Sequence, residues 1–110
     1  MTSYKIAIAS RDSRLIYHFG QADRFLIYEI SGNQCRYLET RDTVPVCSGE
    51  PQTIGHNNNI STAADLIADC RAVLVTRIGE GAAEILRAKG IKPREVSPFI
   101  DAALKQYSEG

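Results

Sequence analysis

The sequence has no excess of either charge, no long apolar run and no closely spaced pair of cysteines. Its thirteen basic and thirteen acidic residues cancel. No cluster of lysine and arginine stands out either, which argues against nucleic acid or an anionic membrane as a partner. The apolar runs are far too short to span a bilayer, and the first residues lack the apolar core of a signal peptide. We therefore expect a cytoplasmic protein that binds neither nucleic acid nor membrane.

Cysteines are few and far apart. Cys35, Cys47 and Cys70 are odd in number, which argues against a disulfide framework and fits a reducing compartment. The absence of a CxxC pair also argues against a closed structural zinc site within one chain. Cys70 falls on the apolar stripe of a predicted helix, and Cys35 lies in a predicted hairpin strand. Both are interpreted as packing residues.

The residues that are present predict one globular α/β domain over residues 1–110. This length is typical of one domain, and 44% hydrophobic residues are enough for one core. The nearly continuous apolar runs at 4–10 and 71–77 predict strands buried on both faces. Two β-rich runs within 24–42, separated by a Gly-Asn turn, predict an antiparallel hairpin.

Helical periodicity begins near residue 60, where Ala63, Leu66, Ile67 and Cys70 share one face. A second helix is predicted to end at Gly90, and a short strand that contains Pro93 suits an edge. A last helix is predicted with Ser97 as its N-cap and Pro98 at its first position. The order of elements is therefore β-β-β-α-β-α-β-α.

This order predicts the topology of the sheet. Because crossovers between parallel strands are right-handed, the first and fourth strands become parallel neighbours, with the hairpin on the other side. We expect a five-stranded mixed sheet of order 3-2-1-4-5 with three helices, which is the three-layer arrangement of the ribonuclease H-like fold. The C-terminal ends of strands 1, 3 and 4 then open on one edge, where open α/β sheets bind ligands.

Three segments rich in His, Arg and Gly follow those strand ends. The first contains Arg11, Arg14 and "YHFG" with His18, the second is "VPVCSGEPQTIGHNNNIS" with Cys47 and His56, and the third is "RIGEG" with Arg77, Gly79 and Gly81. Cysteine and histidine are ligand types for iron, copper or zinc. A loop thiol and surface histidines without a ligand remain the alternative interpretation for Cys47, His56 and His18.

The glycines and arginines of the same edge also have two interpretations. Gly79 and Gly81 stand between a strand and a helix, where free backbone N–H groups and the positive helix end favour an anion. Tight packing between the strand and the helix is the alternative explanation for both glycines. Arg11, Arg14 and Arg77 flank this edge, either as groups that neutralise an anionic ligand or as solvated surface residues.

Longer motifs carry a resemblance to a known family. "HFGQADRFLIYEI", a loop cysteine and "ADLIADCRAVLVTRIGEGAAEILRAKGIKP" resemble the dinitrogenase iron-molybdenum cofactor biosynthesis family, which includes NifX-like and NafY-like carriers and the C-terminal domain of NifB-type proteins. The resemblance implies one nitrogenase-accessory-factor-like domain with a ribonuclease H-like fold. It also implies a carrier, rather than an enzyme, that holds an iron-sulfur or iron-molybdenum cluster precursor as cargo.

The same resemblance implies the site and the partners. His18, Cys47 and His56 become the candidate cluster ligands, and the proteins that donate and accept the cluster during nitrogenase maturation become the partners. A homodimer is plausible because one chain offers few ligands. The loop between the third strand and the first helix is expected to be mobile without ligand.

Two other functions are open from the residues alone. One is a regulatory module that binds a small anion at "RIGEG" and its flanking arginines without metal. The other is a ribonuclease H-like nuclease, which needs several carboxylates that converge on the sheet. The available acids are Asp12, Glu29, Asp65 and Glu80, and their predicted positions are scattered.

Overall fold

The computed structural model describes residues 3–12, 14–32, 34–43 and 63–109 of the chain. A five-stranded sheet lies at its centre. The strands are β1 (Ser3–Ser10), β2 (Arg24–Ser31), β3 (Gln34–Asp42), β4 (Ala72–Val75) and β5 (Lys92–Glu95). They are ordered β3-β2-β1-β4-β5. The antiparallel pairs are β1–β2 and β2–β3, and the parallel pairs are β1–β4 and β4–β5. The predicted order is confirmed.

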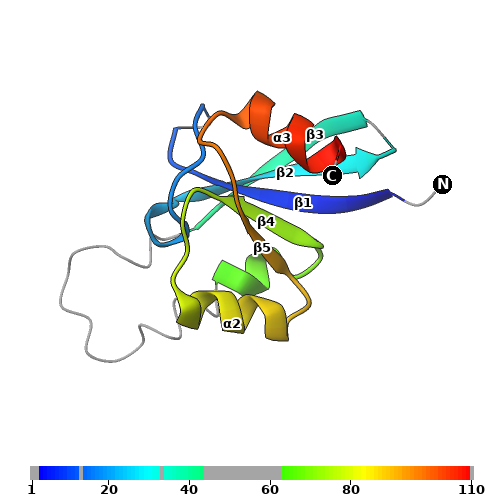
Figure 1. Cartoon of the computed structure of the whole chain (residues 1–110). Coiled ribbons are helices and arrows are strands. Elements are labelled where there is room, and N and C mark those ends of the chain that lie inside the picture. The colour runs from blue at the N-terminus through cyan, green and yellow to red at the C-terminus, as the bar shows by residue number, and fades with distance from the viewer. Residues whose placement is uncertain (1–2, 13, 33, 44–62, 110) are drawn as a thin grey trace.

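Helices cover both faces of this sheet (Figure 1). Helix α3 (Ile100–Glu109) lies on one face, and helix α2 (Glu80–Ala88) lies on the other together with the helical residues 63–66. A short 3-10 turn, η1 (Phe19–Gln21), follows the first connection. The result is the predicted three-layer α/β architecture with three helices.

The alternation of side chains along β1 explains why both faces need a helical layer. Ile6 and Ile8 pack on the α3 side with Leu104, whereas Ala7 and Ala9 pack on the α2 side. All four of these strand residues are fully buried. A central strand of this kind has no solvated face, and the continuous apolar run predicts it correctly.

The last helix begins at Ile100, so the prediction of a helix from Pro98 is wrong. Residues before Ile100 pair with the connection after β1 instead. The backbone N–H of Ile16 donates to the carbonyl of Pro98 at 2.8 Å, and Leu15 and Phe99 form an isolated antiparallel bridge. This long-range pairing holds the segment extended and delays the helix by two residues.

Other boundaries differ by smaller amounts. Strand β4 is shorter than the predicted run 71–77. At its C-terminal end the N–H of Thr76 donates to the carbonyl of Tyr17, in the connection after β1, instead of to a neighbouring strand. Gly90 ends α2 with φ of 83°, as its place after the apolar stripe predicts. None of the helices in the described residues is long and apolar enough to cross a membrane.

Candidate functional site

The edge at the C-terminal ends of β1 and β4 brings two of the three predicted segments together. The N–H of Phe19 donates to the carbonyl of Arg77 at 3.0 Å, and the N–H of Thr76 donates to the carbonyl of Tyr17 at 3.2 Å. Reciprocal bonds of this kind fix the "YHFG" turn against the start of "RIGEG". The convergence predicted from strand direction is therefore confirmed for these two segments.

The segment that contains Cys47 and His56 follows β3, whose end lies beside the same turn. At the end of β3, the N–H of Thr43 donates to the carbonyl of Asp23 at 2.9 Å, and the N–H of Asp23 donates to the carbonyl of Ser10 at the end of β1. Residue 43 thus lies at the edge where β1 ends. Cys47, His56 and the predicted mobile loop lie outside the described residues, so their proximity to His18 stays a prediction.

His18 is the exposed member of a rigid turn. It immediately precedes η1, and its carbonyl accepts from the N–H of Gln21 at 3.1 Å. Its neighbour Phe19 is buried and packs in a tilted arrangement against Phe25, with ring centroids 6.0 Å apart. The buried phenylalanine anchors the turn from below, while the imidazole of His18 faces solvent.

An open depression of about 500 Å³ lies beside this imidazole. His18, Gln21 and Thr76 contribute polar groups to its lining, and Leu15, Val96 and Pro98 contribute apolar ones. The hydroxyl oxygen of Thr76 is buried and has no hydrogen-bond partner within the described residues. A buried polar atom without a partner costs stability, so this oxygen is an unfavourable feature of the folded chain beside the depression.

The connection from β4 to α2 forms the other wall of the edge. Gly79 is the N-cap of α2 and provides no side-chain cap, and the helix begins at Glu80. A Cβ atom placed on Gly79 or Gly81 would meet no other atom of the structure within 4 Å, and neither residue has a positive φ. Tight packing therefore does not explain these glycines within the described chain. Free N–H groups at the start of a helix remain available to an anion.

The arginines of this edge are exposed, and one neighbouring acid has a structural role. Arg11, Arg14 and Arg77 all face solvent. Asp12 caps the turn after β1, because its carboxylate accepts from the N–H groups of Arg14 at 2.9 Å and Leu15 at 3.0 Å. The bond from Leu15, followed by the bond from Arg14, lowers the pKa of Asp12.

The four acids considered for a nuclease do not converge. Glu29 pairs with Arg36 in the hairpin at 3.0 Å, and Asp65 pairs with Lys89 at 2.7 Å. Asp12 caps its own turn, and Glu80 begins α2. No group of three or more His, Cys, Asp or Glu side chains that would hold a metal ion forms within the described residues. The carboxylate cluster of a two-metal nuclease is not assembled there.

Two of the cysteines are packed, as predicted. Cys70 is 3% exposed, and burial raises the pKa of its thiol to about 12. Cys35 lies half-buried in β3 and packs against the cluster on the α3 side. A thiol that stays protonated is a poor metal ligand, so Cys70 belongs to the core.

Sequence reasoning missed Thr76 and the apolar rim of the depression. Thr76 directly follows a buried strand at the ligand edge, and this position is the signal that would have identified it. The contribution of Val96 and Pro98 could not be predicted from the sequence, because it depends on the long-range pairing of residues 15–16 with 98–99.

Comparison with known proteins finds relatives that are similar over most of this chain. FeMo cofactor biosynthesis protein NifB of Frankia alni is 33% identical over 102 residues, which cover 92% of this chain and 20% of that protein. Protein NifY of Azotobacter vinelandii is 34% identical over 93 residues, which cover 83% of this chain and 35% of that protein. The chain thus spans about a fifth to a third of the length of these relatives.

A solved structure is similar over almost its whole length. The crystal structure of PH0822 matches with a TM-score of 0.73 and 23% identity, covering 96% of this chain and 91% of that one. At this identity the similarity establishes the fold. The family model described as dinitrogenase iron-molybdenum cofactor matches residues 2–110. The chain therefore belongs to the dinitrogenase iron-molybdenum cofactor family.

Proposed function

We propose that this protein binds an iron-sulfur or iron-molybdenum cofactor precursor cluster at the edge beside His18 and passes it between proteins of metallocluster maturation. Because the chain belongs to this family, one structural observation supports the proposal directly. The backbone turn that carries the exposed His18 is hydrogen-bonded to Arg77, two residues before the N-cap of α2, at the edge where the chain leaves β3 toward Cys47 and His56.

The chemistry of this edge suits an anionic cluster. Imidazole and thiolate are ligands for iron in sulfide clusters, which supports His18, Cys47 and His56 as ligands. Arg11 and the N–H groups near Gly79 and Gly81 supply positive potential for the sulfides. The depression beside Thr76 provides space next to the imidazole.

A carrier has to release its cargo, and a sparse ligand set serves that purpose. A closed cage of four cysteines would compete with the acceptor for the cluster. We propose that this chain performs no chemical step of its own and exchanges the cluster with a donor and an acceptor protein. A second copy of the chain in a homodimer is a source of further ligands.

The remaining parts of the proposal concern setting and fold. We propose that residues 1–110 form one nitrogenase-accessory-factor-like domain and that its three-layer architecture is of the ribonuclease H-like type. The sheet order and the layers support this assignment. A cytoplasmic location fits the odd number and wide spacing of the cysteines in the sequence.

Anaerobic reconstitution tests the function. The protein is incubated with ferrous iron and sulfide, desalted, and analysed by visible absorbance and by iron and sulfide content. We expect stoichiometric binding that falls at least about tenfold in His18→Ala and Cys47→Ala, since each loses one of few ligands. Cys35→Ala is the matched control, because it removes a thiol that packs on the α3 side of the sheet.

Two outcomes would refute the proposal in different ways. Binding that survives His18→Ala, Cys47→Ala and His56→Ala together would exclude the proposed ligands. An absence of any cluster, combined with binding of inorganic phosphate that depends on Arg77, would favour the small-anion module instead.

A further inference from the structure

We propose that Arg71, Lys92 and Arg94 form a docking surface for an acidic segment of a partner protein. These three side chains are named the basic ridge. The ridge lies at the β5 edge of the sheet, on the α3 side, and contains none of the proposed cluster ligands. The inference therefore stands independently of the cluster-binding proposal.

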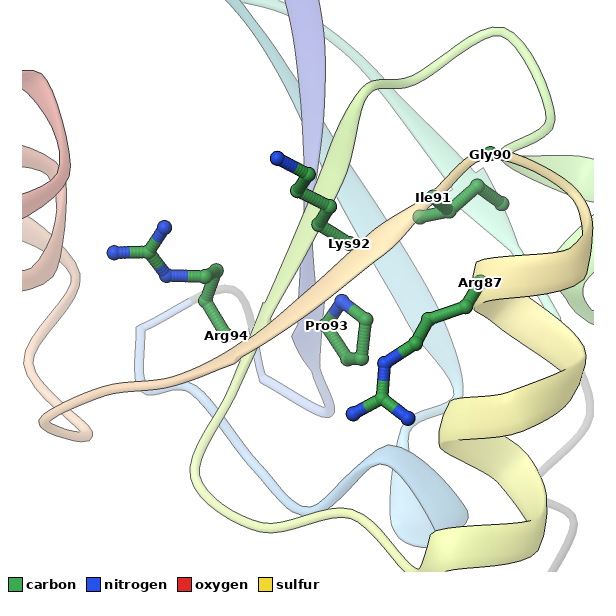
Figure 2. Close-up of a pocket in the computed structure, with 6 residues that line it drawn as sticks. All are labelled: Arg87, Gly90, Ile91, Lys92, Pro93 and Arg94. Atoms are coloured by element: carbon green, nitrogen blue, oxygen red, sulfur yellow. The ribbon is translucent and has the colours of Figure 1, made fainter.

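The sheet places the three cations together. Lys92 and Arg94 are opposite Ala72 and Leu74 in the parallel pair β4–β5, and both of those residues pack on the α3 side. Figure 2 shows the side chains of Lys92 and Arg94 extending from the same side of β5, away from the α2 helix. Arg71 immediately precedes β4, and its carbonyl accepts from the N–H of Lys92 at 2.9 Å.

Aromatic rings support two of these cations. The guanidinium of Arg71 lies 4.6 Å from the ring centroid of Tyr4, and that of Arg94 lies 5.7 Å from the ring centroid of Tyr107. The two tyrosine rings pack edge to face, with their ring centroids 6.3 Å apart. Cation–π contacts of this kind hold arginines in place without neutralising them. The ridge is thus preorganised and keeps its charge.

The basic ridge also lacks carboxylate partners within the described residues. All three of its side chains are exposed, and none takes part in an ion pair there. Three cations on the α2 side, Lys5, Arg41 and Lys89, pair with carboxylates instead. The chain has no net charge, so the uncompensated cations of the ridge create a local positive field.

The backbone of β5 indicates how the partner binds. The N–H groups of Lys92 and Val96 point inward, to carbonyls before and within β4. Pro93 lies between them in the strand and has no N–H to offer outward. A partner strand would find an interrupted ladder of donors, so recognition relies on the side chains of the ridge rather than on addition of a strand.

The form of the surface favours a protein segment over a small anion. Lys92 and Arg94 stand two residues apart on a strand, which separates their Cα atoms by about 7 Å. Lys92 and Arg94 project from β5 and Arg71 from the residue before β4, all into solvent, and the depression that Lys92 and Arg94 line is open rather than closed. Several carboxylates spaced along a peptide match this arrangement better than one compact anion.

Peptide titration monitored by NMR tests the proposal. A hexaglutamate peptide is added to the ¹⁵N-labelled full chain, with hexaglutamine as the uncharged probe. We expect shifts of the amides of Arg71, Lys92 and Arg94 with hexaglutamate alone. The double variant Arg71→Gln/Arg94→Gln should weaken binding at least about tenfold, since two charge-assisted contacts are lost. Arg36→Gln, which removes an exposed cation of β3 at the opposite edge of the sheet, should weaken it less than about twofold.

Three results would overturn the proposal. The first is equal weakening by Arg36→Gln, which would indicate net charge rather than the ridge. The second is a set of shifts centred on His18 and Arg77. The third is inorganic phosphate producing the same shifts at the same affinity, which would assign a small-anion site. The unperturbed amide spectrum of each variant before titration verifies that it is folded.

Discussion

Charged and polar residues are treated in opposite ways in two regions of this molecule. Around Asp69, on the α2 side of the sheet, the side chains satisfy one another. Arg41 donates to both carboxylate oxygens of Asp69, at 2.7 and 3.0 Å, and to the carbonyl of Leu66 at 2.8 Å. Lys5 adds a bond to Asp69 at 3.2 Å. At the open edge around His18, the imidazole faces solvent and the buried hydroxyl of Thr76 has no partner within the described residues.

The difference indicates what each region contributes. A side chain that is already paired lowers the free energy of the folded chain and has little capacity left for a ligand. A polar group without a partner contributes little to stability or costs some, and it persists where binding requires it. We therefore infer that the Asp69 region contributes stability, and the proposed function places binding at the His18 edge. Variants at the two regions should separate these roles.

Among variants of the charged and polar residues in the two regions, Arg41→Ala should have the largest effect on stability. It removes a two-pronged ion pair and leaves the carbonyl of Leu66 without this donor, so we expect a loss of about 1–3 kcal/mol in the free energy of unfolding. Urea denaturation measures the loss. Arg36→Ala, which removes an exposed ion pair with Glu29 on the neighbouring strand, should cost less than about 0.5 kcal/mol. If both variants lost the same free energy of unfolding, the Asp69 region would contribute no more to stability than an exposed ion pair does.

Low pH should reduce the stability that the same region contributes. Hydrogen bonds from Arg41, and then from Lys5, hold the pKa of Asp69 well below its usual range despite partial burial. The carboxylate therefore contributes stability fully above about pH 4, and this contribution is lost as the pH falls further. The stability difference between the natural chain and Asp69→Asn should shrink from pH 7 to about pH 2.5. A constant difference across this range would contradict the assignment.

Thr76→Val should act in the opposite direction. Valine keeps the shape and removes the buried hydroxyl that lacks a partner, so stability should rise by about 0.5–1 kcal/mol. Thermal and urea unfolding measure it. Thr40→Val is the control that removes a hydroxyl with a partner, because the Thr40 hydroxyl contacts that of Tyr37 at 2.6 Å. A destabilised Thr76→Val would indicate that the hydroxyl has a partner in the folded chain.

His18→Ala should have the smallest effect on stability. The side chain is exposed and its turn is held by backbone bonds and by Phe19, so the expected change is below about 0.5 kcal/mol. Phe19→Ala, one residue along, should cost about 3–5 kcal/mol by opening the core. If urea denaturation gave similar costs for both, the imidazole would be structural and the comparison between the two regions would fail.

The sheet was predictable from the sequence because its signals are local and redundant. Nearly continuous apolar runs mark β1 and β4, a Gly-Asn turn marks the hairpin, and the handedness of crossovers then fixes the order of strands. The start of α3 was not predictable. Ser97 and Pro98 are good signals for a helix start, but the pairing of Ile16 with Pro98 overrides them, and local propensity carries no information on that contact.

The site was predictable only in part, for a related reason. Strand direction places His18, Gly79 and Gly81 at one edge, and the backbone bonds between their segments agree with this. The buried oxygen of Thr76 depends on three-dimensional packing and has no sequence pattern. Cys47 and His56 supply ligand types, but the segment that contains them has no periodicity from which a position follows.

Paramagnetic NMR tests the central claim most directly. A paramagnetic iron-sulfur cluster is bound anaerobically to the ¹⁵N-labelled chain, and the broadening of each amide signal is measured against the chain without a cluster. We predict selective broadening of Tyr17, His18 and Phe19 together with Arg77 to Gly81. Amides of the basic ridge and of Asp69 should keep their line widths. Broadening centred on either of those regions, or spread evenly over the chain, would contradict the assignment of the His18 edge as the cluster site.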